Sequence, residues 1–160
     1  MVAGFCWPWS NADGDAPLPR DVEIGAWRRP WNRKPPEMMG GTTPPPHRHP
    51  YTLWATTDAG LDEVGCIYSV QGFEFDYVGV IWGDDLVWRA ESGWVGQPNR
   101  SYDSVVKRAA TDNPQKFTRL LSHTYKVLLS RGMVGMRVVC LDDETKAHLE
   151  TTLGRTNQVV

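Results

Sequence analysis

The stretch Tyr77-Val78-Gly79-Val80-Ile81-Trp82 is a nearly continuous apolar run that Gly83-Asp84-Asp85 ends. Such a run is typical of a strand buried on both faces, as in a parallel sheet covered by helices. Downstream, residues 114–131 place apolar side chains close to a 3.6-residue period, which predicts a helix. Residues 136–141 indicate a second buried strand, and residues 143–153 indicate a last helix. This order of strands and helices predicts an α/β fold with a mostly parallel sheet.

Capping residues bound both predicted helices. Asn113 is a favourable N-cap for the longer helix, and Pro114 suits its first turn. Gly132 follows the last expected turn, where glycine commonly ends a helix in the left-handed conformation. Asp142 is expected to cap the shorter helix, which we predict to end at Gly154.

Shorter elements are predicted on the N-terminal side of the long helix. Residues 65–68 indicate a short strand, and residues 86–89 and 93–95 indicate a small hairpin. We expect a short buried strand within residues 1–6, ended near Pro8 because proline cannot donate a ladder hydrogen bond.

The composition of the chain changes near residue 60. Residues 1–50 hold 10 of the 12 prolines and four of the 8 tryptophans, and no amphipathic helical period occurs there. Residues 33–50 indicate an extended surface loop. We therefore predict a Pro- and Trp-rich irregular segment with an initial strand over residues 1–60, packed on a domain over residues 61–160.

Length, charge and hydropathy exclude several classes of protein. A chain of 160 residues suits one domain with or without a tail. The net charge of −2 argues against a highly basic nucleic-acid-binding tail, although it allows a local basic patch. The hydrophobic content of 41% excludes a wholly disordered chain. No apolar run approaches the ~20 residues that cross a bilayer, and no leader pattern is present, so we expect no membrane partner.

The cysteines and histidines favour neither a disulfide framework nor a metal site. Cys6, Cys66 and Cys140 are odd in number, far apart and in apolar surroundings, which indicates reduced thiols and a cytoplasmic location. His47 and His49 combine with these cysteines in no zinc-binding spacing. We therefore predict no metal ligands.

The chain lacks the phosphate loop of many nucleotide-binding proteins. A Walker A loop needs Gly-Lys-Ser/Thr, and none of the 15 glycines is followed by lysine. The pair Asp84 and Asp85 after the apolar strand is compatible with a magnesium-holding pair. A strand-ending turn is the favoured alternative, because no Walker A loop accompanies the pair.

Residues 69–78 (SVQGFEFDYV) form a candidate site between two predicted strands. Gly72 allows the backbone to approach a ligand closely, and the Glu74 carboxylate can accept hydrogen bonds from ribose hydroxyls. Gln71 is a further polar residue in an otherwise apolar stretch. The structural alternative, which composition alone favours, is a short helical connection with Phe73 and Phe75 packed inward.

Residues 125–132 (YKVLLSRG) form a second candidate site at the end of the long helix. The charge of Arg131 suits the helix dipole there, which is a sufficient structural explanation. The functional alternative is an arginine finger that stabilises charge on a γ-phosphate held by another domain. Residues 117–139 also carry four basic side chains and no acidic one, which suits either a polyanion or a solvated face.

Three tryptophans could stack on nucleic-acid bases, namely Trp82, Trp88 and Trp94. Packing in the core and in the hairpin explains them better, because indole rings bury large areas.

The two candidate sites together resemble a known family. Residues 63–82 (EVGCIYSVQGFEFDYVGVIW) resemble motif V of superfamily 1 helicases, and residues 125–132 resemble their motif VI. The amino-acid sequences of both segments are most similar to those of the Schlafen group 3-like DNA/RNA helicase domain family. Residues 3–10 (AGFCWPWS) and Pro30-Trp31-Asn32 resemble that family as well.

The resemblance implies a RecA-like three-layer fold with a mostly parallel sheet. The motor of this family consists of two RecA-like domains with ATP between them, and only the second carries motifs V and VI. This chain resembles the second domain and is expected to be incomplete as a motor, because the Walker A-bearing first domain has no counterpart in it. The implied partners are an N-terminal RecA-like domain, in the same protein or a split gene product, and DNA or RNA. ATP and Mg²⁺ are implied only for the complete protein.

The resemblance also implies roles for individual residues. Arg131 would be the catalytic residue that contacts the γ-phosphate, and Glu74 would contact the nucleotide sugar. Gln71 and Gly72 would complete the nucleotide-binding set and couple it to the nucleic-acid backbone. The residues implied for nucleic-acid coupling are Ser69, Gln71 and Lys126. Ser130 departs mildly from the family, since many members carry threonine there.

The implied function is that of a C-terminal motor domain of an ATP-dependent superfamily 1 DNA/RNA helicase, inactive alone. The alternative is a non-enzymatic nucleic-acid-binding or interaction module that retains the fold.

Overall fold

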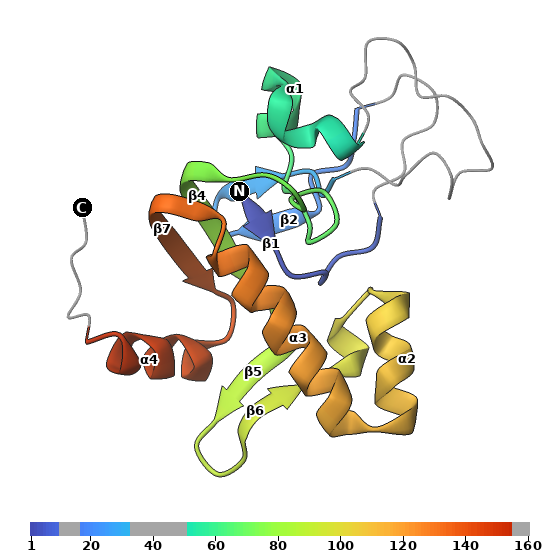
Figure 1. The fold of residues 1–160 in the computed structure, drawn as a ribbon, viewed down its shortest axis with the longest axis vertical. Helices are drawn as coiled ribbons and strands as arrows, with labels where there is room; N and C mark the ends of the chain where they lie inside the picture. Colours follow the sequence, from blue (N-terminus) through green and yellow to red (C-terminus); the bar gives the residue numbers. More distant parts are fainter. Residues whose placement is uncertain (10–16, 33–50, 155–160) are drawn as a thin grey trace.

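A parallel sheet forms the centre of the computed structural model, which describes residues 1–9, 17–32 and 51–154 (Figure 1). Its strands lie in the order β1 (Val2–Ala3), β4 (Phe75–Trp82) and β7 (Gly132–Cys140). Both neighbouring pairs run parallel. The predicted α/β fold with a mostly parallel sheet is therefore confirmed, and the arrangement is consistent with part of a RecA-like fold.

Single bridges extend this parallel arrangement beyond β1. Val2 pairs with Gly65, and Val64 pairs in turn with Trp31. The backbone N–H of Val64 donates to the Pro30 carbonyl at 2.9 Å. Residues 2–3 and Trp31 thus contribute backbone to the sheet rather than only covering it.

Two hairpins, four α-helices and two 3-10 helices surround the sheet in the described part of the chain. They are β2 (Val22–Ile24) with β3 (Trp27–Arg29), η2 (Tyr51–Thr56), α1 (Asp58–Leu61), β5 (Leu86–Arg89) with β6 (Gly93–Gly96), η3 (Pro98–Arg100), α2 (Ser104–Asp112), α3 (Pro114–Leu129) and α4 (Asp143–Thr152).

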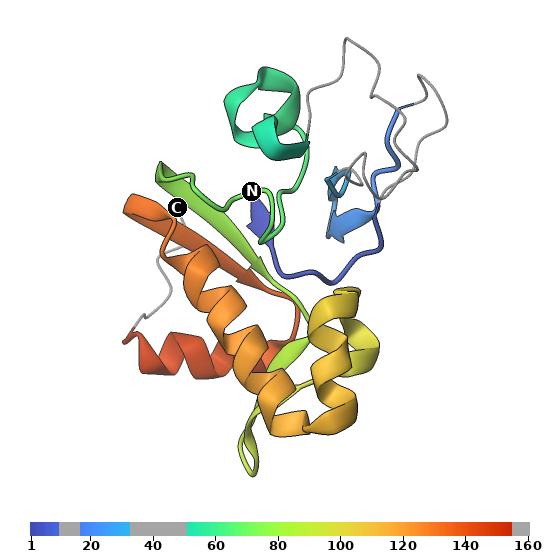
Figure 2. The same ribbon diagram turned by 45° about the vertical axis from the view of Figure 1, so that its right-hand side comes forward.

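Helix α3 covers one face of the sheet, and α2 packs beside it (Figures 1 and 2). The Asn113 side chain accepts a hydrogen bond from the Lys116 N–H and so caps α3 as predicted. The helix buries one apolar stripe against Val80 and its neighbours. The stripe consists of Phe117, Leu121, Tyr125 and Leu128.

The opposite face of the sheet packs against aromatic side chains from the N-terminal segment. Successive strand residues point to opposite faces, so Ala3 and Ile81 face away from α3. Both belong to a second buried cluster with Val22 and Trp31, and Trp31 is fully buried. Burial of these rings accounts for the tryptophan-rich composition of this segment.

Most of the predicted elements are confirmed, and three details are wrong. The strand predicted as buried over residues 136–141 is β7, which begins at Gly132 and contains no buried residue. Residues 65–68 form a bridge and a turn rather than a strand. Gly132 is not in the left-handed conformation but is the first residue of β7. A Cβ on Gly132 would lie 2.5 Å from the Gly135 carbonyl oxygen, so close packing explains this glycine. Gly154, with φ of 63°, does follow α4 in the left-handed conformation.

The sequence did not predict α2 or the β2–β3 hairpin. Asp103 accepts hydrogen bonds from the N–H groups of Val105 and Val106, so an N-cap signal for α2 was present. The loop predicted for residues 33–50, with His47 and His49, lies outside the described residues. The division at residue 60 stays a prediction.

Candidate functional site

The two candidate segments meet where β4 and β7 begin. The N–H of Phe75, the first residue of β4, donates to the Arg131 carbonyl at 2.9 Å. The Arg131 guanidinium in turn donates through Nη1 to the Phe73 carbonyl at 3.2 Å. The structure therefore places the residue 69–78 segment directly beside the end of α3.

Arg131 is partly buried and keeps part of its donor capacity. Its Nε donates to the Val127 carbonyl at 3.1 Å, and Nη2 donates to the Ser130 hydroxyl at 3.0 Å. With the Phe73 contact, three of the five N–H groups of a guanidinium have partners among the described residues. Two N–H groups remain for a ligand, and the side chain is held rigidly at the end of the helix.

A tight turn supports the segment that Arg131 contacts. The Ser69 hydroxyl accepts a hydrogen bond from the Cys66 N–H at 2.8 Å and one from Asn32 Nδ2 at 3.3 Å. Ser69 is only 1% exposed, so its hydroxyl belongs to the interior and does not reach the surface. Gly72, with φ of 86°, lets the chain reverse before β4.

After Ser69, the polar residues of this segment are exposed. Gln71 and Glu74 point to solvent, and no described residue forms a hydrogen bond or ion pair with either side chain. Phe73 and Phe75 are partly buried and stacked, with ring centroids 6.5 Å apart. The alternative of inward-packed phenylalanines is correct in this respect, but no helix carries them: Phe73 follows the turn at Gln71 and Gly72, and Phe75 begins β4.

Lys126 lies one turn before the end of α3 and is exposed. Gln71, Gly72, Glu74 and Arg131 are thus gathered at one end of the sheet. Lys126 lies on the helix that leads to them.

Replacing Gly72 with alanine is expected to lower the free energy of unfolding by about 1 kcal/mol. The cost comes from the positive φ alone, since nothing lies within 4 Å of an added Cβ. Denaturant unfolding measures it. Gly25→Ala is the matched comparison and should cost a similar free energy of unfolding, because Gly25 also has a positive φ and open space around it. A Gly72→Ala chain as stable as the parent would contradict this account.

Of the acidic pair at the other end of β4, Asp84 is partly exposed and Asp85 belongs to the interior. Asp85 is fully buried. Its Oδ1 accepts a hydrogen bond of 2.6 Å from the Tyr125 hydroxyl. Its Oδ2 has no partner among the described residues. Burial raises the pKa of Asp85, and it raises the pKa of Tyr125 and of Cys6 as well. These contacts support the turn interpretation for Asp84 and Asp85.

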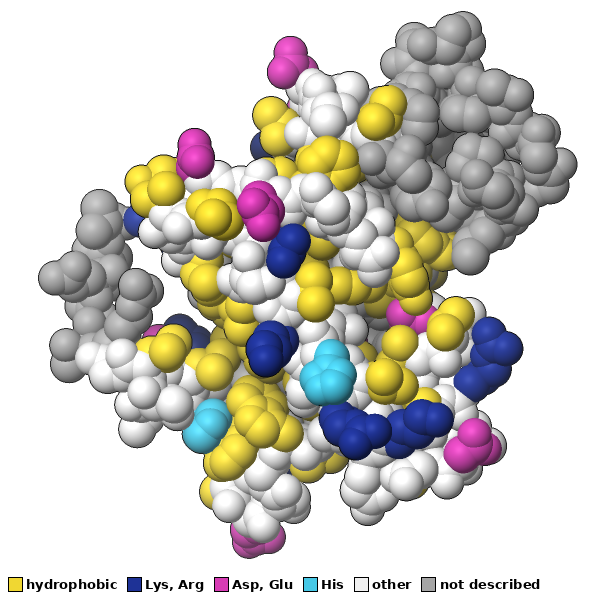
Figure 3. Space-filling view, viewed as in Figure 1, with side chains coloured by type: hydrophobic (Ala, Val, Ile, Leu, Met, Phe, Trp, Pro, Cys, Tyr) yellow, Lys and Arg dark blue, Asp and Glu magenta, His cyan; other side chains and the backbone are white. Residues whose placement is uncertain are grey.

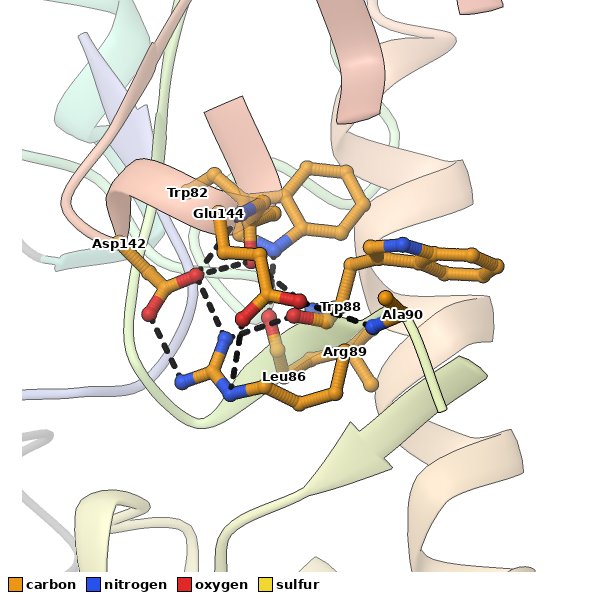
Figure 4. A network of polar contacts seen from close by, with 8 residues as sticks. Trp82, Leu86, Trp88, Arg89, Ala90, Asp142 and Glu144 are labelled. Atoms are coloured by element: carbon orange, nitrogen blue, oxygen red, sulfur yellow. Dashed lines mark hydrogen bonds and ion pairs between the residues drawn. The ribbon is translucent and has the colours of Figure 1, made fainter. Parts of the chain in front are cut away.

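A second polar network joins the β5–β6 hairpin to α4 (Figure 4). Arg89 donates to both carboxylate oxygens of Asp142 at 2.9 Å, and its Nε lies 3.5 Å from Glu144. Asp142 also caps α4 by accepting from the Thr145 N–H, as predicted. The hydrogen bonds from Arg89 lower the pKa of Asp142 to about 2. Arg89, Asp142 and Glu144 all bond to groups of the hairpin or of α4, so the network explains the packing of α4 rather than a ligand site.

The tryptophans divide between core and surface. Trp82 is buried and stacks on Tyr125 with centroids 4.1 Å apart, and Trp88 stacks on His148 at 3.6 Å. Packing therefore explains these two rings, as predicted. Trp94 is only partly buried and lines an open groove.

Within residues 1–9, 17–32 and 51–154, no group of three or more His, Cys, Asp or Glu side chains is placed to hold a metal ion. The three cysteines are free thiols. No helix in this part of the chain has the length and apolar character needed to span a membrane.

Comparison with known proteins identifies one family. The family described as Schlafen group 3, DNA/RNA helicase domain, matches residues 1–142. The uncharacterized protein YPL245W of Saccharomyces cerevisiae is 29% identical over 102 residues, which is 61% of this chain and 22% of that protein. The chain therefore spans less than a quarter of that relative. No solved structure matches the chain.

Proposed function

Because the chain belongs to the Schlafen group 3 DNA/RNA helicase domain family, we propose that it acts as the second RecA-like domain of an ATP-dependent superfamily 1 helicase. In this role it supplies an arginine finger to ATP that another domain holds. The observation that carries the proposal is the junction of the two segments, where Arg131 bonds to the Phe73 carbonyl and two of its N–H groups have no partner among the described residues.

The described residues fit one side of an ATP site. Arg131 would donate to the γ-phosphate, and the exposed Glu74 carboxylate would accept from the ribose hydroxyls. Gln71 and Gly72 lie beside them in the same turn. The chain has no Gly-Lys pair, so the phosphate-binding lysine and the Mg²⁺ ligands would come from the partner domain.

The same contacts offer a route from the nucleotide to the nucleic acid. Arg131 bonds to the residue 73–75 backbone through both its side chain and its carbonyl, so a displacement of Arg131 would pull on this segment. Gln71 lies at the exposed end of the turn, and Ser69 anchors the turn from inside. We assign Gln71 to the nucleic-acid contact, and Ser69 to support of that contact.

The test is ATP hydrolysis by the purified chain with single-stranded nucleic acid, alone and after addition of a Walker A-bearing RecA-like domain from the same protein or a neighbouring reading frame. We expect no turnover by the chain alone, because half of the site is missing. Turnover should appear when both domains are present. Robust hydrolysis by the chain alone would contradict the proposal.

A non-enzymatic binding module is the second candidate, and the basic side chains of α3 favour it. It would be preferred if the chain binds single strands but no ATP hydrolysis appears, whichever Walker A-bearing domain is added.

A further inference from the structure

Helix α3 carries an exposed cationic stripe. Its cationic members are Lys116, Arg119 and Lys126, and His123 lies between them. The spacing of three, four and three residues puts them on one face of the helix, over about 15 Å of its axis. All four are exposed, and α3 contains no acidic residue. In the part of the chain that the structure describes, none of them is in an ion pair.

An aromatic groove adjoins this stripe. It has a volume of about 400 Å³ and is open to solvent between α3 and the β5–β6 hairpin. Trp94 and Trp82 line its apolar wall, Ser122 and Ser130 add hydroxyls, and Lys126 belongs to both the groove and the stripe. In Figure 3, hydrophobic side chains lie where α3 passes the hairpin, with Lys, Arg and His side chains around them.

Trp94 is held in place before any ligand arrives. Its ring lies 5.2 Å from the ring of Trp82 and 5.5 Å from that of Trp88. A ring fixed in this way loses little conformational freedom when a planar group packs on it. A groove that combines a fixed indole with a neighbouring ammonium group suits a base and its phosphate.

We propose that α3 and the β5–β6 hairpin form a docking site for single-stranded nucleic acid. A base enters the groove against Trp94, and the backbone phosphates lie along the cationic stripe. A duplex would keep its bases stacked away from the groove, and an acidic polypeptide would use the stripe without the indole. The proposal rests on the proposed function only in taking nucleic acid as the ligand.

The experiment is fluorescence anisotropy of a labelled oligothymidylate of about 15 nucleotides, titrated with the chain at several salt concentrations without ATP. Lys116→Gln with Arg119→Gln should reduce the slope of log affinity against log salt by about 1.4. Trp94→Leu should weaken binding by about tenfold. Lys107→Gln with Arg108→Gln removes the same charge from exposed positions on α2 and should leave the slope within about 0.3 of the parent value.

Photo-cross-linking keeps the test valid if Trp94→Leu is unstable. A 4-thiothymidine oligonucleotide should form adducts at Trp94 or at residues 122–130. Absence of salt-dependent binding, equal losses in the α2 control, or adducts confined to other surfaces would each overturn the proposal. The proposal would also be overturned if polyglutamate displaced the labelled oligothymidylate and the Trp94→Leu variant bound the oligothymidylate as tightly as the parent chain does. Because no ATP is present, this test and the hydrolysis test can fail independently.

Discussion

Arg131→Ala is expected to slow ATP hydrolysis by about 10³-fold or more when the chain is joined with a Walker A-bearing domain. The guanidinium would stabilise charge that develops on the transferred phosphoryl group, and alanine leaves nothing in its place. Steady-state hydrolysis with saturating nucleic acid measures the effect.

Two variants separate this role from a structural one. Arg137→Ala removes an exposed cation from β7 in the same basic stretch and should leave the rate within about twofold of the parent. Arg131→Lys keeps the charge but loses the planar fork that reaches the Phe73 carbonyl, so most of the loss should persist. Arg131→Ala also removes the three hydrogen bonds described above, so its unfolding must be measured alongside. An unchanged rate in a folded Arg131→Ala protein would exclude Arg131 from the reaction.

Tyr125→Ala is expected to destabilise the chain by about 3–5 kcal/mol, the range for large aromatic side chains removed from a core. Tyr125 is fully buried, stacks on Trp82 and accepts a hydrogen bond from the Gly83 N–H at 2.9 Å. Denaturant unfolding followed by circular dichroism gives the free energy of unfolding. A loss below about 1 kcal/mol would contradict the packing described here.

Tyr125→Phe is the matched variant, because it keeps the ring and removes only the hydroxyl. The Gly83 N–H and Asp85 Oδ1 would then both lose their partner inside the fold. We expect a loss of about 2 kcal/mol, the typical cost of leaving buried polar groups unsatisfied.

The burial of Asp85 beside Tyr125 also predicts how the stability of the chain depends on pH. Because burial raises the pKa of Asp85, the folded chain holds this proton more tightly than the unfolded chain does. The contribution of Asp85 to stability is therefore full at low pH and is lost as the pH rises through its folded-state pKa. Asp142 acts in the opposite sense: its contribution is lost as the pH falls from the usual range of an aspartate towards about 2.

Unfolding measured above pH about 4.5 separates the effect of Asp85 from that of Asp142, since Asp142 is then largely ionised in both states. Asp85→Asn should flatten the dependence in that range. A parent chain and an Asp85→Asn chain with the same pH profile would contradict the assignment.

Local features of the sequence were sufficient for much of the fold. Helix α3 follows from its apolar period and the Asn113 cap, and α4 follows from the Asp142 cap. Strand β4 follows from its apolar run. The residues of the candidate site could also be identified from the amino-acid sequences of residues 69–78 and 125–132, which resemble motifs of the family to which the chain belongs.

Patterns along the chain were thus enough to assign the class of the fold, its main elements and the residues to test. The structure alone decided which of them meet. The hydrogen bond from Arg131 to the Phe73 carbonyl joins residues 58 positions apart, and the one from Tyr125 to Asp85 joins residues 40 apart. It also decided that Ser69 is interior and that Trp94 borders a groove beside Lys126. Periodicity and capping depend on neighbouring residues and can be read along the chain, whereas these contacts depend on strand order, register and the packing of α3, which no short stretch specifies.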